Sequence, residues 1–170
     1  KGNLIKWNPA VKTAADRDAL RAGLLDGAVD VVATDHAPHT LEEKERPYAS
    51  APSGGPLVQH SLPMMLELSA QGVSPVETVV EKMCHAPARL FGVRDRGFLR
   101  TGHFADIVLV RPADPWTVSK ENILYKCGWS PLEGTAFSHR VVRTLVNGRT
   151  VYADGRVDTA HRGAELEFDR

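Results

Sequence analysis

Residues 29–40 read Val29-Asp30-Val31-Val32-Ala33-Thr34-Asp35-His36-Ala37-Pro38-His39-Thr40, and this stretch indicates the fold class. Its first half is β-branched and almost entirely apolar, which is typical of a strand buried on both faces of a parallel sheet. Upstream we expect a short strand within residues 4–12. A helix should follow, from the capping pair Thr13 and Asp16 to Gly27. Strand, helix and strand in this order form a βαβ unit and predict an α/β fold.

The rest of the chain divides near residue 95. Before this point the sequence predicts a helix over residues 57–70, a second one that begins at the capping pattern Ser74-Pro75-Val76-Glu77, and a helical piece at residues 86–91. After it we expect a strand at residues 105–110, irregular segments marked by Pro112, Pro115 and Pro131, and a β-hairpin that turns at Asn147-Gly148. The predicted domains are therefore a barrel-like α/β part over residues 1–95 and a mainly β part over residues 96–170.

Composition and length exclude several classes of protein. The 21 basic residues balance the 21 acidic ones, so the chain lacks the charge expected of a general nucleic-acid or membrane-surface binder. No apolar run is long enough to cross a bilayer. With 170 residues the chain is too short for a complete (β/α)₈ barrel of about 250 residues. Cys84 and Cys127 form no CxxC pair, which favours a reducing, cytoplasmic environment, and the start at Lys1 leaves open a longer protein.

The candidate chemistry lies directly after the predicted strand. Asp35, His36 and His39 follow its last residue, and active sites of parallel α/β folds are built where strands end. Carboxylate oxygens and imidazole nitrogens bind divalent metals, and a carboxylate beside a metal can accept the proton of an acidified water. Zinc usually takes four ligands, so the spacing alone also allows a turn with solvated histidines.

Other segments are open to a functional and a structural interpretation. Residues 52–56, Pro-Ser-Gly-Gly-Pro, could hold an anion through backbone N–H groups or form a flexible surface loop. Asn8 could bind an amide substrate or simply begin an Asn-Pro turn. We interpret the charged run at residues 41–46 as solvated. His60 is expected to be structural or to cap a helix, and His85 to make local hydrogen bonds.

Several motifs together resemble a known family. Residues 33–40, followed by Glu42-Glu43-Lys44, resemble the last barrel strand and the following loop of class I dihydroorotases, which belong to the amidohydrolase superfamily. The resemblance runs in order through nearly the whole chain. Its other motifs are Lys6-Trp7-Asn8-Pro9, Ala51-Pro52-Ser53-Gly54, Ala86-Pro87-Ala88-Arg89-Leu90-Phe91-Gly92 and Gly102-His103-Phe104-Ala105-Asp106-Ile107-Val108.

The resemblance implies a fold and a reaction. Residues 1–95 would be the last βα units of a metal-dependent (β/α)₈ TIM barrel with its catalytic loop, and residues 96–170 the C-terminal portion of a small β-sandwich domain. The reaction would be the reversible hydrolysis of dihydroorotate to carbamoyl-aspartate in de novo pyrimidine biosynthesis. Asp35 matches the metal ligand and general base, whereas Asn8, His39 and the backbone at Ser53 and Gly54 match the substrate-binding positions. His36 is expected only to support the site.

The resemblance also implies a cofactor and partners. The family uses a divalent metal pair, usually two zinc ions per full-length subunit, and most of their ligands would precede Lys1, so this segment alone should be inactive. Expected partners are the N-terminal remainder of the protein, a second copy in a homodimer, and aspartate carbamoyltransferase. The loop at residues 54–60 and His85 depart from the usual motifs. A hydantoinase or allantoinase, or an inactive homologue that acts as an assembly partner, therefore stays an alternative.

Overall fold

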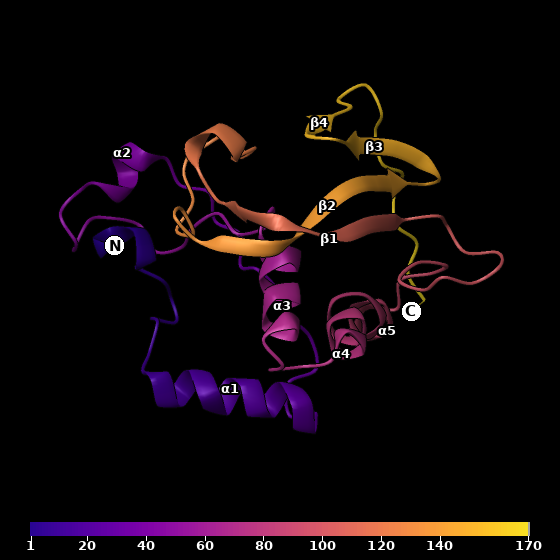
Figure 1. The fold of residues 1–170 in the computed structure, drawn as a ribbon, viewed down its shortest axis with the longest axis horizontal. Coiled ribbons are helices and arrows are strands. Elements are labelled where there is room, and N and C mark those ends of the chain that lie inside the picture. The colour runs from indigo at the N-terminus through magenta and orange to yellow at the C-terminus, as the bar shows by residue number, and fades with distance from the viewer. Residues whose placement is uncertain (170) are drawn as a thin grey trace.

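The computed structural model describes residues 1–169, with helices in the first half and one sheet in the second (Figure 1). The helical elements are η1 (Gly2–Ile5), α1 (Ala14–Asp26), α2 (Leu41–Lys44), α3 (Ser61–Ala70), α4 (Val76–Val80), η2 (Glu81–His85), α5 (Ala86–Phe91) and η3 (Lys120–Asn122). The strands are β1 (Ile107–Thr117), β2 (Ala136–Val146), β3 (Arg149–Ala153) and β4 (Arg156–Val157). This mixture of helices and strands agrees with the predicted α/β class.

The predicted boundaries of α1 are confirmed. The Thr13 hydroxyl accepts a hydrogen bond from the N–H of Asp16 at 3.3 Å, and the Asp16 carboxylate accepts one from the N–H of Thr13 at 3.0 Å. These bonds satisfy backbone donors that the first turn of a helix leaves free. Gly27 ends the helix with φ of 90°, a left-handed conformation that glycine adopts without a steric penalty.

Two other helix starts differ from the prediction. Helix α3 begins at Ser61 rather than near residue 57, since residues 58–60 form a separate turn in which the His60 N–H donates to the Leu57 carbonyl at 3.0 Å. The N–H groups of Leu57 and Val58 donate to the ring of His36. Helix α4 begins at Val76 with Pro75 in the capping position, so the predicted cap by Ser74 is wrong. The Ser74 hydroxyl is buried instead, without a hydrogen-bond partner among residues 1–169.

The C-terminal half forms an antiparallel sheet in the order β1-β2-β3-β4. Strand β1 is longer than predicted, since Pro112 and Pro115 lie within it and a register shift falls between Pro112 and Trp116. An edge strand tolerates proline because some of its N–H groups have no ladder partner to lose. The predicted hairpin is confirmed: Asn147 and Gly148 have φ of 51° and 77°, as a type I′ turn requires.

The predicted βαβ unit does not form a sheet within residues 1–169. Residues 4–12 begin as the η1 turn and continue as a loop, and residues 29–34 run without strand pairing. A strand exists only through hydrogen bonds to a neighbour. The Val32 N–H donates to the Lys82 carbonyl at 3.0 Å, and the next pairing along the chain is a single parallel bridge between His36 and Gly55. Residues 29–34 therefore have the amino-acid composition of a buried strand, but no neighbouring strand pairs with them within residues 1–169.

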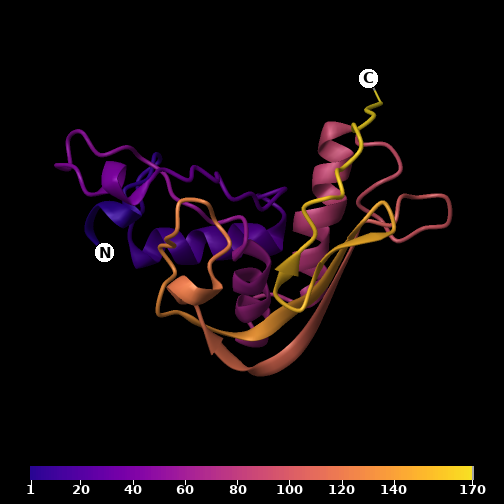
Figure 2. The same ribbon diagram turned by 90° about the horizontal axis from the view of Figure 1, so that it is seen from above.

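The sheet forms one layer, and α3, α4 and α5 cover one of its faces, with α1 farther from it (Figures 1 and 2). The main core lies between these helices and consists of Leu24, Met65, Leu66 and Val79, with Val29, Val32, Leu62, Leu68, Met83 and Val110 packed against it. Within residues 1–169 no helix has the length and hydropathy needed to span a membrane. All strands begin after residue 106, while the domain division near residue 95 stays a prediction.

Candidate active site

Three segments that are distant in sequence meet beside residue 35. The N–H of Gly54 donates to the Lys6 carbonyl at 2.9 Å, which holds residues 6–8 against residues 53–55. The N–H of Ala37 donates to the Gly55 carbonyl at 3.2 Å and holds the second of these segments against residues 35–39. All the residues predicted for the site therefore lie on three segments that are hydrogen-bonded together.

Asp35 occupies the position where the apolar segment 29–34 ends. Its backbone is left-handed, with φ of 44°, and the residue is exposed. Aspartate is among the few residues other than glycine that adopt this conformation, and such outliers are often found at functional sites. The turn at Asp35 ends the extended segment and leaves the carboxylate accessible to a substrate.

The ring of His36 supports the loop that follows. Its Nδ1 atom accepts hydrogen bonds from the N–H groups of Leu57 at 3.1 Å and Val58 at 3.4 Å. An accepting Nδ1 places the proton on Nε2, so the imidazole is neutral. The ring also lies 5.4 Å from the Tyr125 ring. These contacts agree with the supporting role predicted for His36.

His39 and Ser53, both predicted to bind substrate, are in direct contact. The Nε2 atom of His39 lies 3.1 Å from the Ser53 carbonyl oxygen, and because a carbonyl only accepts, Nε2 is the donor. The Nδ1 atom lies 3.7 Å from the Glu43 carboxylate. In this structure His39 therefore fixes the backbone of the loop at residues 52–55, and its own contact with a substrate stays a prediction.

Gly54 and Gly55 allow a close approach of the three segments. Gly54 has φ of 108°, and a Cβ atom added there would lie 2.6 Å from the Cβ of Ala37. A Cβ at Gly55 would lie 3.0 Å from the ring of Trp7. Gly54 therefore excludes a side chain, because its first carbon would overlap Ala37, whereas a side chain at Gly55 would require the ring of Trp7 to shift by a few tenths of an ångström.

Asn8 lies two residues after Lys6 and is exposed. The Lys6 ammonium donates to the carbonyls of Tyr48 and Ala51, each at 2.6 Å, so the start of this segment is tied to the loop before Ser53. The backbone thus brings Asn8 into the same assembly as Ser53. Its side chain is free to contact a substrate, a role that stays a prediction.

The described part of the chain does not hold a complete metal site. Among residues 1–169 no three His, Cys, Asp or Glu side chains are grouped as a metal ion would require. Asp35 alone, with an exposed carboxylate at the end of residues 29–34, has a donor of the right kind and place. Its carboxylate has the chemistry of a metal ligand, a role that stays a prediction.

The prediction that residues 41–46 form a solvated stretch is wrong at Lys44, which is 1% exposed. Thr40 and Glu43 form a capping box that begins α2, and this turn directs Lys44 into the protein. Its ammonium lies between the carbonyls of Pro52 and Gly54. The capping pattern Thr-x-x-Glu was a signal for this helix, but an interior Lys has no sequence signature.

His60 is buried completely, and its side chain does not cap α3. Its Nδ1 atom lies 3.1 Å from the Tyr125 hydroxyl, which accepts from the Gln59 N–H and therefore donates to the ring. The Nε2 atom has no partner among the described residues. Burial lowers the pKa of His60 to about 4 and raises the pKa of Tyr125 to about 12, so both groups are neutral near pH 7.

The buried His60 predicts a stability that falls in acid. Unfolded His60 binds a proton near its ordinary pKa of 6.5, whereas the folded group does so only near 4, so unfolding takes up a proton between these values. The free energy of unfolding should fall by about 2–3 kcal/mol from pH 7 to pH 4 on this account. Urea titrations at several pH values should show this fall reduced in His60→Gln and retained in His103→Gln. Equal pH dependence in the two variants would contradict it.

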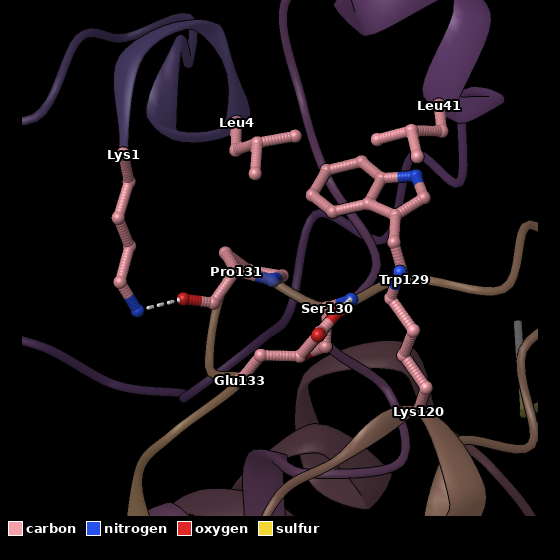
Figure 3. Close-up of a pocket in the computed structure, with 8 residues that line it drawn as sticks. All are labelled: Lys1, Leu4, Leu41, Lys120, Trp129, Ser130, Pro131 and Glu133. Atoms are coloured by element: carbon pink, nitrogen blue, oxygen red, sulfur yellow. Dashed lines mark hydrogen bonds between the residues drawn. The ribbon is translucent and has the colours of Figure 1, made fainter.

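A cavity of about 350 Å³ lies on the other side of Trp129 and is lined by Leu4, Leu41, Ser130 and Pro131 among others (Figure 3). The indole N–H of Trp129, which also lines the cavity, donates to the His39 carbonyl at 2.8 Å. None of the five predicted site residues lines it. Trp129 therefore contacts both the cavity and the segment that carries His39.

Comparison with known proteins shows the family to which the chain belongs. The model of the amidohydrolase family matches residues 8–151. A dihydroorotase of Pelobacter propionicus is 42% identical over 147 residues, which are 86% of this chain and 34% of that protein. A dihydroorotase of Halobacterium salinarum is 38% identical over 165 residues, which are 97% and 39% of the two chains.

Solved structures show the same fold. The L-hydantoinase (dihydropyrimidinase) of Arthrobacter aurescens superposes with a TM-score of 0.84 and 32% identity over 93% of this chain and 36% of its own. A D-hydantoinase of Bacillus sp. AR9 superposes with a TM-score of 0.84 and 26% identity over 92% and 36% of the two chains. The chain thus spans little more than a third of the length of its relatives.

Proposed function

Because the chain belongs to the amidohydrolase family, we propose that it is the C-terminal part of a dihydroorotase that opens and closes the cyclic amide of dihydroorotate. The observation that carries this proposal is the assembly of Asp35, His39, Ser53, Gly54 and Asn8 on three joined segments. The dihydroorotases of Pelobacter and Halobacterium support it through 42% and 38% identity.

In this proposal residues 1–95 are the last βα units of a (β/α)₈ barrel and residues 96–170 a portion of a β-sandwich domain. The unpaired apolar segment 29–34 supports the barrel, since it would find its neighbouring strands in the remainder of the full-length protein. The TM-score of 0.84 with a hydantoinase supports the same fold. The chain spans about a third of the length of its relatives, 34% in the first case. On this proposal segment 29–34 is unpaired because its neighbouring strands belong to the other two thirds.

Asp35 carries the proton transfer in the proposed reaction. When a water oxygen attacks the amide carbonyl carbon, the Asp35 carboxylate accepts the water proton and then delivers it to the ring nitrogen as the C–N bond breaks. Its accessible position supports both contacts. A divalent metal held in part by Asp35 would supply an acidified water and charge stabilisation at the carbonyl oxygen.

The other site residues bind and orient the substrate. Asn8 offers an amide that can both donate to and accept from the cyclic amide. In this proposal the loop at Ser53 and Gly54 faces the carboxylate of the substrate. The Gly54 N–H already donates to the Lys6 carbonyl, so the Ser53 N–H is the donor to the carboxylate. His39 holds this backbone through the Ser53 carbonyl. When these groups are fixed before the substrate binds, less entropy is lost on the way to the transition state, and the activation free energy of the hydrolysis is lower.

The proposal includes cofactors, partners and location. Two zinc ions per full-length subunit would take their remaining ligands from the rest of the protein, as the single donor Asp35 suggests. The assembly would be a homodimer, with aspartate carbamoyltransferase as a further partner. A reducing cytoplasm and a place in pyrimidine biosynthesis fit two free cysteines, Cys84 and Cys127.

A hydantoinase is the second candidate, because hydantoinase structures superpose well on the chain. The two activities differ in the substrate carboxylate, which dihydroorotate carries and hydantoin lacks. Sites that bind a polar group discriminate strongly against analogues without it, often by about 10⁴-fold or more. Identity to dihydroorotases over most of the chain favours the first candidate.

A substrate panel tests the choice between the two. The full-length protein, loaded with zinc, should hydrolyse dihydroorotate with a kcat/KM at least about 100-fold above its values for hydantoin and allantoin. The ring opening of each substrate can be followed by its ultraviolet absorbance. A preference for hydantoin would overturn the dihydroorotase proposal, and no turnover of any cyclic amide would overturn both candidates.

A further inference from the structure

Lys44 has surroundings unlike those of a surface lysine. Its side chain is 1% exposed, and its Nζ atom donates to the carbonyls of Gly54 at 2.8 Å, Pro52 at 2.9 Å and Lys6 at 3.3 Å. An ammonium group has three N–H donors, so the three carbonyls match its full capacity. No carboxylate forms an ion pair with it among residues 1–169.

The three carbonyls come from the segments that carry the proposed substrate-binding residues. Lys6 precedes Asn8 by two positions, and Pro52 and Gly54 flank Ser53. The carbonyl between them, that of Ser53, accepts from His39 at 3.1 Å. Three consecutive carbonyls of this loop are therefore bound by protein donors, two of them by one buried ammonium.

We propose that Lys44 is a positioning residue that turns the carbonyl oxygens of the loop at residues 52–55 into the protein and so prepares the opposite side for a substrate carboxylate. This inference rests on the proposed function. Carbonyl oxygens repel an anion, whereas backbone N–H groups attract it. Because two of these oxygens are bound to a side chain that is 1% exposed, they point into the protein and do not face a carboxylate at its surface.

Burial of the Lys44 ammonium has a free-energy cost, because the charged group loses its contact with water. Burial lowers the pKa of Lys44, and the charge of Lys6 lowers it further. A buried charge without a partner of opposite sign must be stabilised by hydrogen bonds, here by dipoles of the backbone. Gly54 and Gly55 have more backbone freedom to lose than other residues would have at these positions. A fixed ammonium reduces that freedom at both ends of Ser53.

Kinetics of the full-length protein test this role. Lys44→Met removes all three donors and should raise the KM for dihydroorotate at least about 10-fold with kcat changed by less than about threefold, the pattern of lost substrate binding. Lys44→Gln keeps two N–H donors without the charge and should give an intermediate KM. Lys12→Met, at an exposed position, should match the wild type. If the Met variant does not fold, the Gln variant decides.

Hydrogen exchange gives a readout that does not depend on activity. The Gly54 N–H, which donates to the Lys6 carbonyl, should exchange at least about 10-fold faster in Lys44→Met and unchanged in Lys12→Met. An unchanged exchange rate would overturn the positioning role. Faster exchange with an unaltered KM would overturn its link to the substrate. If the wild type opens no cyclic amide, the proposed function fails, while the exchange rate still decides whether Lys44 holds the loop.

Discussion

Replacing Asp35 by Asn should lower kcat for dihydroorotate in the full-length protein by about 10²- to 10⁴-fold, the contribution expected of a general base. Asn keeps the shape of the side chain and tolerates the left-handed backbone that Asp35 adopts, with φ of 44°. What it removes is the ability to accept a proton from water and return it to the leaving nitrogen. The KM should change much less, because the groups that hold the substrate lie on other residues.

The control for this variant is Asp30→Asn. Asp30 is exposed and belongs to the same extended segment, but it lies five residues before the proposed base. Its amide variant should keep wild-type kinetics. Both variants should be compared for zinc content by atomic absorption, since Asp35 is also a proposed ligand. Wild-type turnover in Asp35→Asn at normal zinc content would contradict the assignment of the base.

Gly54→Ala should disrupt the site through the backbone. The added Cβ would lie 2.6 Å from the Cβ of Ala37, and φ of 108° is a conformation that alanine rarely adopts. The strain of such a backbone is about 1–3 kcal/mol, and the loop can relieve it only by moving away from residues 35–39. We expect kcat/KM to fall at least about 30-fold, since displacement of positioning groups by one ångström can cost 100-fold.

Gly128→Ala distinguishes the effect of backbone strain at a positive φ from the effect of a clash with a neighbouring segment. Gly128 also has a positive φ, 71°, but its added Cβ would meet nothing within 4 Å. It should therefore lower the free energy of unfolding, measured by urea titration, without a large effect on kcat/KM. Equal losses of activity in the two glycine variants would show that the contact between Gly54 and Ala37 has no special importance.

Local signals predicted much of the fold. The capping box at Thr13 and the turn at Asn147-Gly148 depend on neighbours in sequence, and both were confirmed. The segment 29–34 has the composition of a buried strand, yet it is unpaired here, because pairing depends on residues distant in sequence. Helix α3 begins later than expected, and the N–H groups of Leu57 and Val58 before it bind the ring of His36, a contact that residues distant in sequence provide.

The site could be predicted in part. Motif spacing placed Asp35, Asn8 and Ser53 on segments that the structure joins by hydrogen bonds. It did not predict that His39 binds the Ser53 carbonyl or that Lys44 is buried, since a lysine within a charged run has the composition of a solvated one. Burial of a charge depends on the carbonyls that tertiary structure brings to it, and no local pattern encodes them.

The carbonyl contacts of Lys44 also determine how the site responds to salt. Exposed ion pairs such as Arg17–Asp18 and Arg94–Glu167 are screened by dissolved ions, because water and counter-ions reach both partners. Among residues 1–169 Lys44 has no acidic partner to exchange for a chloride, and its side chain is 1% exposed. The geometry of the loop at residues 52–55 should therefore persist at high ionic strength. Any effect of salt on catalysis would then act on the approach of the anionic substrate rather than on the shape of its site.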